Sequence, residues 1–464
     1  MISTIEGNMD EIIKLFASFR ADVNFTLEEC KYNSPLSIAA IEGHEDVIQL
    51  LLDNGAEPNL ALPSIAADQQ GCTALHLASH YGNKKVAKLL LQRGAEPNTA
   101  DASGATPLFD ASSQGHKDLV QLLLDKGADP NMVAQSGDNP LFSAAIKGHK
   151  DVVKLLLDKG VEPNTADQNG VTPLYCAAQG GQKDVVQLLL DKGADPNMAD
   201  QNGVTPLFYA ALKGYKHVVK LLLLGGAEPN MPLFDGATPL KCAASEGHKD
   251  VVQLLLLGGA EPNMADLNGF TPLINAVHNN HKDVVKLLLV GGAQPNMANN
   301  NGSSPLNFAA GHGLKDVVKL LLLGGAEPNV ADQDGFTPLH SAAHNGQKDM
   351  VQLLLYAGAE PNITTLGGST TLHFASYDGH KDVVQLLLDG GAQPNIEDNS
   401  GQTPLHKAAH KGHKNVVKLL LRRGSKQNMK DQDGRTPLSI ALDRGHVAVA
   451  NILSSPRISI SLSL

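Results

Sequence analysis

Three pairs of histidines have a spacing that could bind a metal ion. They are His76 and His80, His340 and His344, and His406 and His410. Residues four apart lie on one face of a helix, so each pair could supply two ligands of a zinc site. A tetrahedral site needs further donors, and no cysteine or carboxylate recurs at a suitable position. We therefore expect no metal to be bound.

The cysteines offer little chemistry of their own. Cys30, Cys72, Cys176 and Cys242 form no CxxC pair. Cys176 and Cys242 lie 66 residues apart at equivalent positions of a repeated pattern, which we expect to place them too far apart for a disulfide. Unbridged thiols are typical of a reducing compartment.

Sequence motifs of common catalytic sites are missing. The chain has no HExxH, no GxxxxGK[ST], no GxSxG and no HRD followed by DFG. We therefore expect no enzymatic activity and no cofactor.

Composition and charge argue against nucleic acid and membrane as partners. The net charge is −11, and the 37 Lys and Arg residues mostly stand beside Asp or Glu, as in His149-Lys150-Asp151. A phosphate backbone needs a concentrated basic surface instead. Apolar runs such as Val219 to Leu224 end well before the 18 residues of a membrane span, and the N-terminus lacks signal-peptide features. We expect a cytoplasmic protein that does not insert into membranes.

The chain repeats with a period of 33 residues. Thr-Pro-Leu or a variant begins at positions 73, 106, 139, 172, 205, 238, 271, 304, 337, 370, 403 and 436. A thirteenth copy, Ser34-Pro35-Leu36, precedes position 73 by 39 residues, which is one period plus six. Such a period predicts stacked copies of one supersecondary unit.

Residues 167–199 show how one unit should fold. Asp167-Gln168-Asn169-Gly170 is typical of a turn, and Thr172 can cap a helix over Leu174 to Gln179 that ends at Gly180-Gly181. Lys183-Asp184 should open a second helix over Val185 to Leu190, which Gly193 ends before Pro196 forces an extended return. Neither helix can bury its apolar side alone, so neighbouring units must stack.

The unit resembles an ankyrin repeat, whose signature contains Thr-Pro-Leu-His-x-Ala-Ala followed by Gly-His. The chain keeps the His at His76, His340, His373 and His406, and it keeps Gly-His in several units, for example Gly115-His116, Gly148-His149, Gly247-His248, Gly379-His380 and Gly412-His413. The resemblance spans about residues 2–454. It implies an all-α solenoid of helix-turn-helix units with β-hairpin-like loops.

Two departures from the ankyrin pattern leave local details open. The usual Asp-Val-Asn ending is often Asp/Glu-Pro-Asn, as in Glu162-Pro163-Asn164. The signature His becomes aromatic in four consecutive units, at Phe109, Phe142, Tyr175 and Phe208. These aromatic residues leave open how the start of the first helix is hydrogen bonded.

The repeat divides the chain into three parts. Residues 1–33 should form a partial N-terminal capping repeat, 34–453 the array and 454–464 a flexible tail, with His446 to Leu453 as the last helix. The six-residue insertion lies near 60–65 and reads as a surface loop, with a binding finger as the alternative. The alternating Ile and Leu residues of the tail also suit a strand added to a partner.

The resemblance implies that protein partners bind along the concave face, which hairpin tips and the residues after Ala-Ala line. Apolar and aromatic side chains gather at these positions between about 212 and 377: Leu212, Phe234, Leu267, Phe270, Phe336, Leu366 and Tyr377. Exposed apolar side chains in register tend to mark an interface. The alternative is that some of them pack sideways against neighbouring tips.

Histidines recur on the same helix positions. His278, His344 and His410 follow the Ala-Ala position, and His312 stands beside Gly311. A row of imidazoles could make binding change between pH 6 and 8. The alternative is that these histidines have no common role.

The sequence therefore predicts a monomeric, non-catalytic scaffold or adaptor that binds one or more proteins. Two other functions stay open. One is a host-directed ankyrin effector delivered into another cell, and the other is a regulatory subunit of an enzyme.

Overall fold

The computed structural model describes residues 23–24, 34–62 and 71–455. The predicted partial repeat at 1–33, most of the insertion and most of the tail lie outside these residues. The described chain divides into two compact units, which are residues up to Phe234 and residues from Asp235 onward.

Within the described residues, both units contain helix pairs and no strand of a sheet. In the first unit the first helices are α3 (Pro35–Glu42), α5 (Ala74–His80), α7 (Pro107–Ser113), α9 (Pro140–Lys147), α11 (Pro173–Gln179) and α13 (Pro206–Lys213). Their partners are α4 (Glu45–Asp53), α6 (Lys84–Gln92), α8 (Lys117–Asp125), α10 (Lys150–Asp158), α12 (Lys183–Asp191) and α14 (Lys216–Leu224).

The second unit continues the same alternation. Its first helices are α15 (Pro239–Ser245), α17 (Pro272–His278), α19 (Pro305–Gly311), α21 (Pro338–His344), α23 (Thr371–Asp378), α25 (Pro404–Lys411) and α27 (Pro437–Asp443). Its second helices are α16 (Lys249–Leu257), α18 (Lys282–Val290), α20 (Lys315–Leu323), α22 (Lys348–Tyr356), α24 (Lys381–Asp389), α26 (Lys414–Arg422) and α28 (Val447–Ser454).

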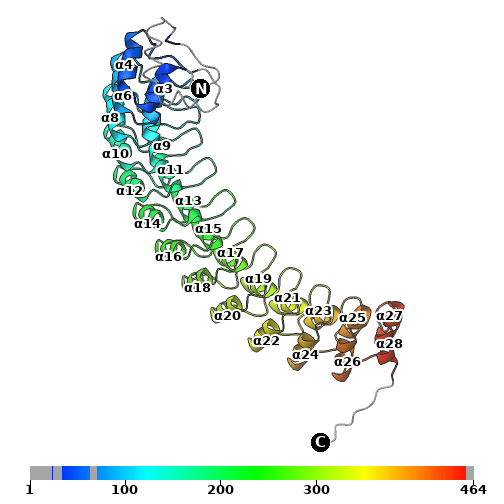
Figure 1. The fold of residues 1–464 in the computed structure, drawn as a ribbon. Coiled ribbons are helices and arrows are strands. Elements are labelled where there is room, and N and C mark those ends of the chain that lie inside the picture. The colour runs from blue at the N-terminus through cyan, green and yellow to red at the C-terminus, as the bar shows by residue number, and fades with distance from the viewer. Residues whose placement is uncertain (1–22, 25–33, 63–70, 456–464) are drawn as a thin grey trace. The chain divides into compact units, whose positions relative to one another are not determined.

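Each unit is built in two layers of helices. First helices pack against first helices, as α17 does against α19, and second helices pack against second helices, as α18 does against α20. Figure 1 shows the loops between repeats projecting on the side of the first helices, away from the second helices. The all-α repeat architecture predicted from the sequence is confirmed.

The predicted helix boundaries agree with the structure to within two residues. Helix α11 begins at Pro173, and Thr172 caps it by accepting a hydrogen bond from the Tyr175 N–H. Helix α12 spans Lys183–Asp191, and Gly193 follows in the left-handed region with φ 85°. A side chain at that φ is strained, so glycine suits this helix end.

The core lies between the two helix layers and recurs in every repeat. In the unit around α17 and α18, Leu273, Ala276, Val284, Val285 and Leu288 are all buried. Because one helix pair cannot enclose these side chains alone, the neighbouring repeats complete the core on both sides.

Two kinds of polar contact tie neighbouring repeats together, the second of them only in repeats that have a histidine before the second helix. The asparagine of the Pro-Asn ending bridges repeats: the Asn164 side chain donates to Gly193 O at 3.2 Å and accepts from the Asp195 N–H at 2.8 Å. The histidine of a Gly-His pair also reaches the preceding repeat, since His149 Nε2 lies 2.9 Å from Ser113 O. The sequence change to Asp/Glu-Pro-Asn therefore leaves this asparagine bridge intact.

The described ends of the insertion pair like a hairpin. The Leu62 N–H donates to Cys72 O at 2.9 Å, and the Gly71 N–H donates to Leu62 O at 3.1 Å. Residues 63–65 lie outside the described chain, so the choice between a plain loop and a binding finger stays open.

Candidate interaction surface

The hairpin tips are held by a repeated set of hydrogen bonds. Asp266 Oδ1 accepts from the N–H groups of Asn268 and Phe270, each at 2.9 Å. The Asn300 N–H donates to Asn268 O at 3.0 Å, which links this tip to the next. The same link recurs along the second unit, so the tip side chains at 267, 300, 333 and 366 are in register.

Several of the predicted tip residues are strongly exposed. Leu267 is 71% exposed and Leu366 is 73% exposed, both in the second unit. In the first unit Phe234 is 79% exposed, whereas Leu212 is half-buried on α13. Exposed apolar side chains on a fixed backbone are what an interaction surface requires.

Phe270 and Phe336 behave differently from the leucine tips. Both are half-buried, and each packs against a phenylalanine on the first helix of the following repeat. The ring centroids of Phe270 and Phe308 are 5.9 Å apart, and those of Phe336 and Phe374 are 5.2 Å apart. These two residues therefore pack onto the first helices of the following repeats, and not against neighbouring tips as the alternative from the sequence supposed.

The expected row of histidines is divided into three groups. The His278 ring lies 5.2 Å from that of His312, while His344 Nδ1 lies 2.9 Å from Asp378 Oδ2. His410 stacks on Tyr377 at 6.2 Å, and Lys411 Nζ lies 4.5 Å from the centre of the Tyr377 ring.

His410, one of the histidines of these three groups, has a shifted pKa. Its partial burial, and then the nearby cations of Arg444, Lys411 and Lys407 and the His446 ring, lower its pKa. That binding depends on pH stays a prediction. The histidines of the three groups have different neighbours, so they would not act as one row.

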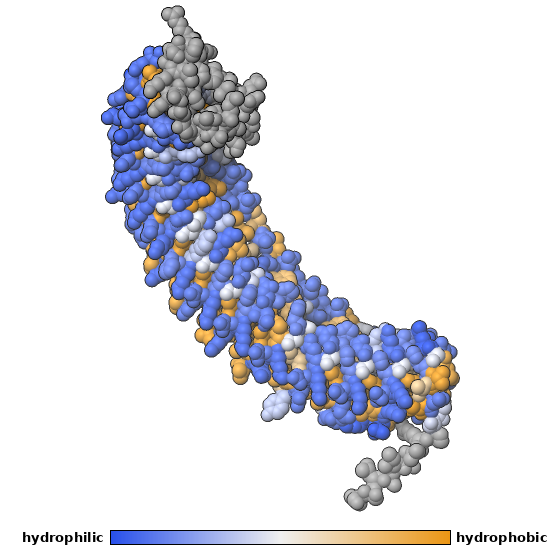
Figure 2. Space-filling model, viewed as in Figure 1, coloured by the Kyte–Doolittle hydropathy of each residue, from blue (hydrophilic) through white to orange (hydrophobic). Residues whose placement is uncertain are grey.

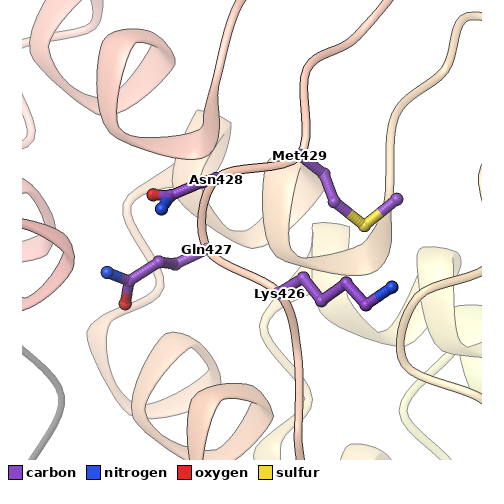
Figure 3. A pocket seen from close by; sticks show the side chains of 4 residues that line it. All are labelled: Lys426, Gln427, Asn428 and Met429. Atoms are coloured by element: carbon purple, nitrogen blue, oxygen red, sulfur yellow. The ribbon is translucent and has the colours of Figure 1, made fainter.

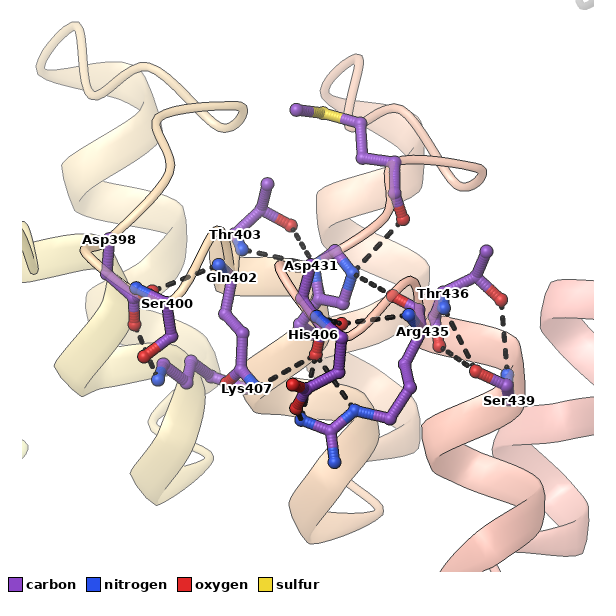
Figure 4. Close-up of polar contacts among 12 residues, drawn as sticks. Asp398, Ser400, Gln402, Thr403, His406, Lys407, Asp431, Arg435, Thr436 and Ser439 are labelled. Atoms are coloured by element: carbon purple, nitrogen blue, oxygen red, sulfur yellow. Dashed lines mark hydrogen bonds and ion pairs between the residues drawn. The ribbon is translucent and has the colours of Figure 1, made fainter.

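The signature histidines are committed to helix caps. His373 Nδ1 accepts from the Thr370 N–H at 3.0 Å, and His373 Nε2 lies 3.0 Å from Gln402 O in the next repeat. Figure 4 shows His406 in the same role, between Thr403 and the backbone of Arg435. Burial lowers the pKa of both His340 and His373 to about 4.

In each pair of histidines spaced i, i+4, the first histidine is one of these capping residues. His76 uses both ring nitrogens for hydrogen bonds, to Thr73 and Ala105 O, and His340 uses its Nδ1 with Thr337. Within residues 23–24, 34–62 and 71–455, no three His, Cys, Asp or Glu side chains gather in a way that could hold a metal ion.

In the first unit, aromatic residues replace the signature histidine without loss of the helix cap. Thr172 and Thr205 accept from the N–H groups of Tyr175 and Phe208, at 3.2 and 3.1 Å. The aromatic ring cannot return a hydrogen bond to the threonine N–H, so one half of the capping box is lost. This settles the local hydrogen bonding that the sequence left open.

The described cysteines and the loop after α26 do not form a site. Cys176 and Cys242 are unbridged, and burial raises the pKa of the Cys176 thiol to about 12. Figure 3 shows a pocket lined by Lys426, Gln427, Asn428 and Met429, four consecutive residues of the loop after α26. Gln427 and Asn428 point away from Lys426 and Met429, so no polar groups converge there.

The comparisons with known proteins match this geometry. A family model described as ankyrin repeats in three copies matches nine overlapping segments that run from residue 1 to residue 463. The chain belongs to the ankyrin-repeat family. No significant match to a curated protein is found.

The ankyrin-repeat family typically serves as a protein-interaction module rather than as an enzyme, and this is the general function that membership supports. Within the described parts of the chain, no helix is long and apolar enough to cross a lipid bilayer.

Sequence reasoning missed two groups of residues. Phe308 and Phe374 belong to the tip contacts, and the signal was a phenylalanine 38 residues after each tip phenylalanine. The other group, which we call the second-helix row, is Leu257, Val290, Leu323 and Tyr356, at the last positions of α16, α18, α20 and α22. Their exact 33-residue spacing was visible in the sequence.

Proposed function

We propose that this ankyrin-repeat protein is a non-catalytic scaffold or adaptor that binds a protein partner through the tip face of its second unit. The tip face consists of exposed side chains on hairpin tips and first helices: Leu267, His278, His312, His344, Leu366 and Tyr377. The strong exposure of Leu267 and Leu366 on hydrogen-bonded tips is the observation that carries the proposal.

The tip face combines apolar anchors with polar groups that can give specificity. Leu267 and Leu366 lie on tips in register, and Tyr377 stacks with His410 beside Lys411. Interfaces typically draw most of their binding energy from a few such apolar and aromatic residues. The inter-tip hydrogen bonds keep the backbone ordered, so little conformational entropy is lost on binding.

The half-buried phenylalanines hold the hairpin tips against the first helices of the following repeats. Phe270 and Phe336 pack against Phe308 and Phe374 of the following repeats. We assign them to positioning the tips relative to the first helices. A partner should contact the exposed leucines rather than these rings.

The test is affinity capture from cytosol with three forms of the full chain. One is the natural sequence, one carries Leu267→Ser, Leu366→Ser and Tyr377→Ser, and one carries Leu257→Ser, Val290→Ser and Leu323→Ser as a matched control. We expect a protein that the natural and control forms capture and the tip variant loses. Equal capture by all three forms with unchanged circular dichroism would contradict the proposal.

A further inference from the structure

The second-helix row is an exposed apolar stripe on the opposite layer of helices from the tip face. Leu257, Val290, Leu323 and Tyr356 are 79, 81, 86 and 93% exposed. Figure 2 shows apolar colour at the edge of the molecule over these second helices. Such a run of large apolar side chains in water is unusual unless something covers it.

The same position is charged in the neighbouring repeats, which shows that folding does not require an apolar residue there. It is Asp125, Asp158 and Asp191 in the first unit and Asp389 in the second, although Leu224 at the end of α14 in the first unit is also apolar and is 76% exposed. Three of these aspartates bridge to the next repeat, with Asp125 3.4 Å from Lys159, Asp158 2.7 Å from Lys192 and Asp389 2.6 Å from Arg423. The apolar side chains therefore add nothing that the core needs.

Glycine follows three of the four row residues, as it also follows Asp389, whereas lysine follows the three aspartates of the first unit. Gly258, Gly291 and Gly324 succeed Leu257, Val290 and Leu323, whereas Lys159 succeeds Asp158. A Cβ on Gly291 would lie 2.8 Å from Leu256 Cδ1, and one on Gly324 would lie 3.0 Å from Leu289 Cδ1. Leucines of the preceding repeat thus fill this space, and no long side chain shields the row.

Opposite charges flank the row. Lys286 and Lys319 precede Val290 and Leu323 by four residues and lie on the same helix faces. On the other flank, beyond the helix ends, Glu261, Glu327 and Glu360 are exposed. Two lysines therefore lie on one edge of the stripe and three glutamates on the other, while Gln253, Gln294 and Gln352 occupy the remaining equivalent positions.

We propose that the second-helix row binds the same row of a second copy of this chain, with the two arrays parallel. A second copy has apolar side chains at the identical repeat spacing, so four residues meet four. A two-fold axis along the stacking direction sets the lysine edge of one copy against the glutamate edge of the other. The antiparallel arrangement would set glutamate against glutamate.

The size of the row suits such a dimer. Four side chains of this kind and exposure present roughly 500–600 Å², so two rows bury about 1,000–1,200 Å², near the lower limit for a specific interface. The dimer would present two tip faces, and a partner with two binding sites would gain avidity from them. This inference does not depend on the proposed function, because it concerns the other layer of helices.

The test is the mass of the full chain in solution, measured by sedimentation velocity from about 1 to 100 µM. We expect the natural sequence to shift from 48.9 kDa toward twice that mass as its concentration rises. Leu257→Asp, Val290→Asp and Leu323→Asp, which copy the aspartates of neighbouring repeats, should keep the chain monomeric. The control carries Val133→Asp, Leu442→Asp and Val447→Asp at exposed apolar positions outside the row and should still dimerise.

Two results would overturn the proposal: a natural chain that stays monomeric throughout this range, or a row variant that dimerises as the natural chain does. Because aspartate already occupies this position in folded repeats, we expect the row variant to keep its helical circular dichroism.

The parallel arrangement has its own test. Lys319→Glu places a carboxylate opposite Glu327 of the facing copy and should weaken the dimer about tenfold or more. Adding Glu327→Lys to the same chain restores opposite charges and should recover the affinity. Failure of the second substitution to rescue the first would contradict the parallel arrangement.

Discussion

The two units share one backbone pattern but carry different side chains at two repeated positions. At the end of the second helix the first unit has mostly polar residues, such as Asp125, Asp158 and Asp191, with Leu224 as an apolar exception, whereas the second unit has the second-helix row followed by Asp389. At the start of the first helix, the first unit has aromatic residues in four consecutive repeats, and the second unit has His340, His373 and His406. The residue at the end of the second helix therefore changes the exposed surface, and the residue at the start of the first helix changes how stability depends on pH, while the apolar core stays the same.

The largest expected effect concerns the capping histidines of the second unit. The folded-state pKa of His340 and His373 is about 4, below the usual value near 6.5. The unfolded chain therefore binds more protons than the folded chain between pH 6.5 and 4. The stability of these caps is fully present above pH 6.5 and falls as the pH drops, by up to about 2 kcal/mol per histidine at pH 5.

The chain itself offers a residue that should remove this dependence. Asn307 occupies the histidine position in α19, where its Oδ1 accepts from the Ser304 N–H at 3.1 Å and its Nδ2 donates to Phe336 O at 3.0 Å. His340→Asn with His373→Asn should therefore keep the cap without titrating. Urea unfolding at pH 7 and pH 5 measures both forms, and an equal loss of stability in the two would contradict this explanation.

The next effect separates supporting residues from exposed ones. Phe336→Ala removes the ring contact with Phe374 and should lower the free energy of unfolding by about 1–3 kcal/mol. Leu366→Ala changes a side chain that is 73% exposed and should leave stability within about 0.5 kcal/mol. Chemical denaturation compares them, and equal losses would mean that Phe336 does not support the tips.

The smallest effect concerns the charged helix ends of the first unit. Asp158→Leu gives α10 the ending found in the second-helix row and breaks the contact with Lys192. Both side chains of this ion pair are well exposed, so we expect a loss below about 0.5–1 kcal/mol. Thermal unfolding of Asp158→Leu beside Asp158→Asn measures this loss. A larger loss would show that the aspartate is needed for folding.

Most of the fold followed from the repeat, while the contacts between repeats did not. Thr172 and Gly193 mark helix ends locally, so α11 and α12 were predicted to within two residues. The contact of Phe270 with Phe308 depends on how one hairpin lies over the following repeat, and spacing alone does not give that position. The sequence therefore could not show that the tip leucines are more exposed than the tip phenylalanines.

The second-helix row was missed for a different physical reason. Leu254 to Leu257 form a continuous apolar run, and such a run indicates burial. Helix α16 ends at Leu257, which places that side chain outward while Leu255 is buried. The equivalent of Leu257 is an aspartate in other repeats, such as Asp158 and Asp191, and this was the sequence signal that the position faces outward.

The most direct test of the account is capture by the tip variant, Leu267→Ser, Leu366→Ser and Tyr377→Ser, beside the control Leu257→Ser, Val290→Ser and Leu323→Ser. The account predicts that a protein partner bound by the natural chain is lost by the tip variant and retained by the control. A partner retained by the tip variant and lost by the control would contradict it, because binding would then depend on the second helices.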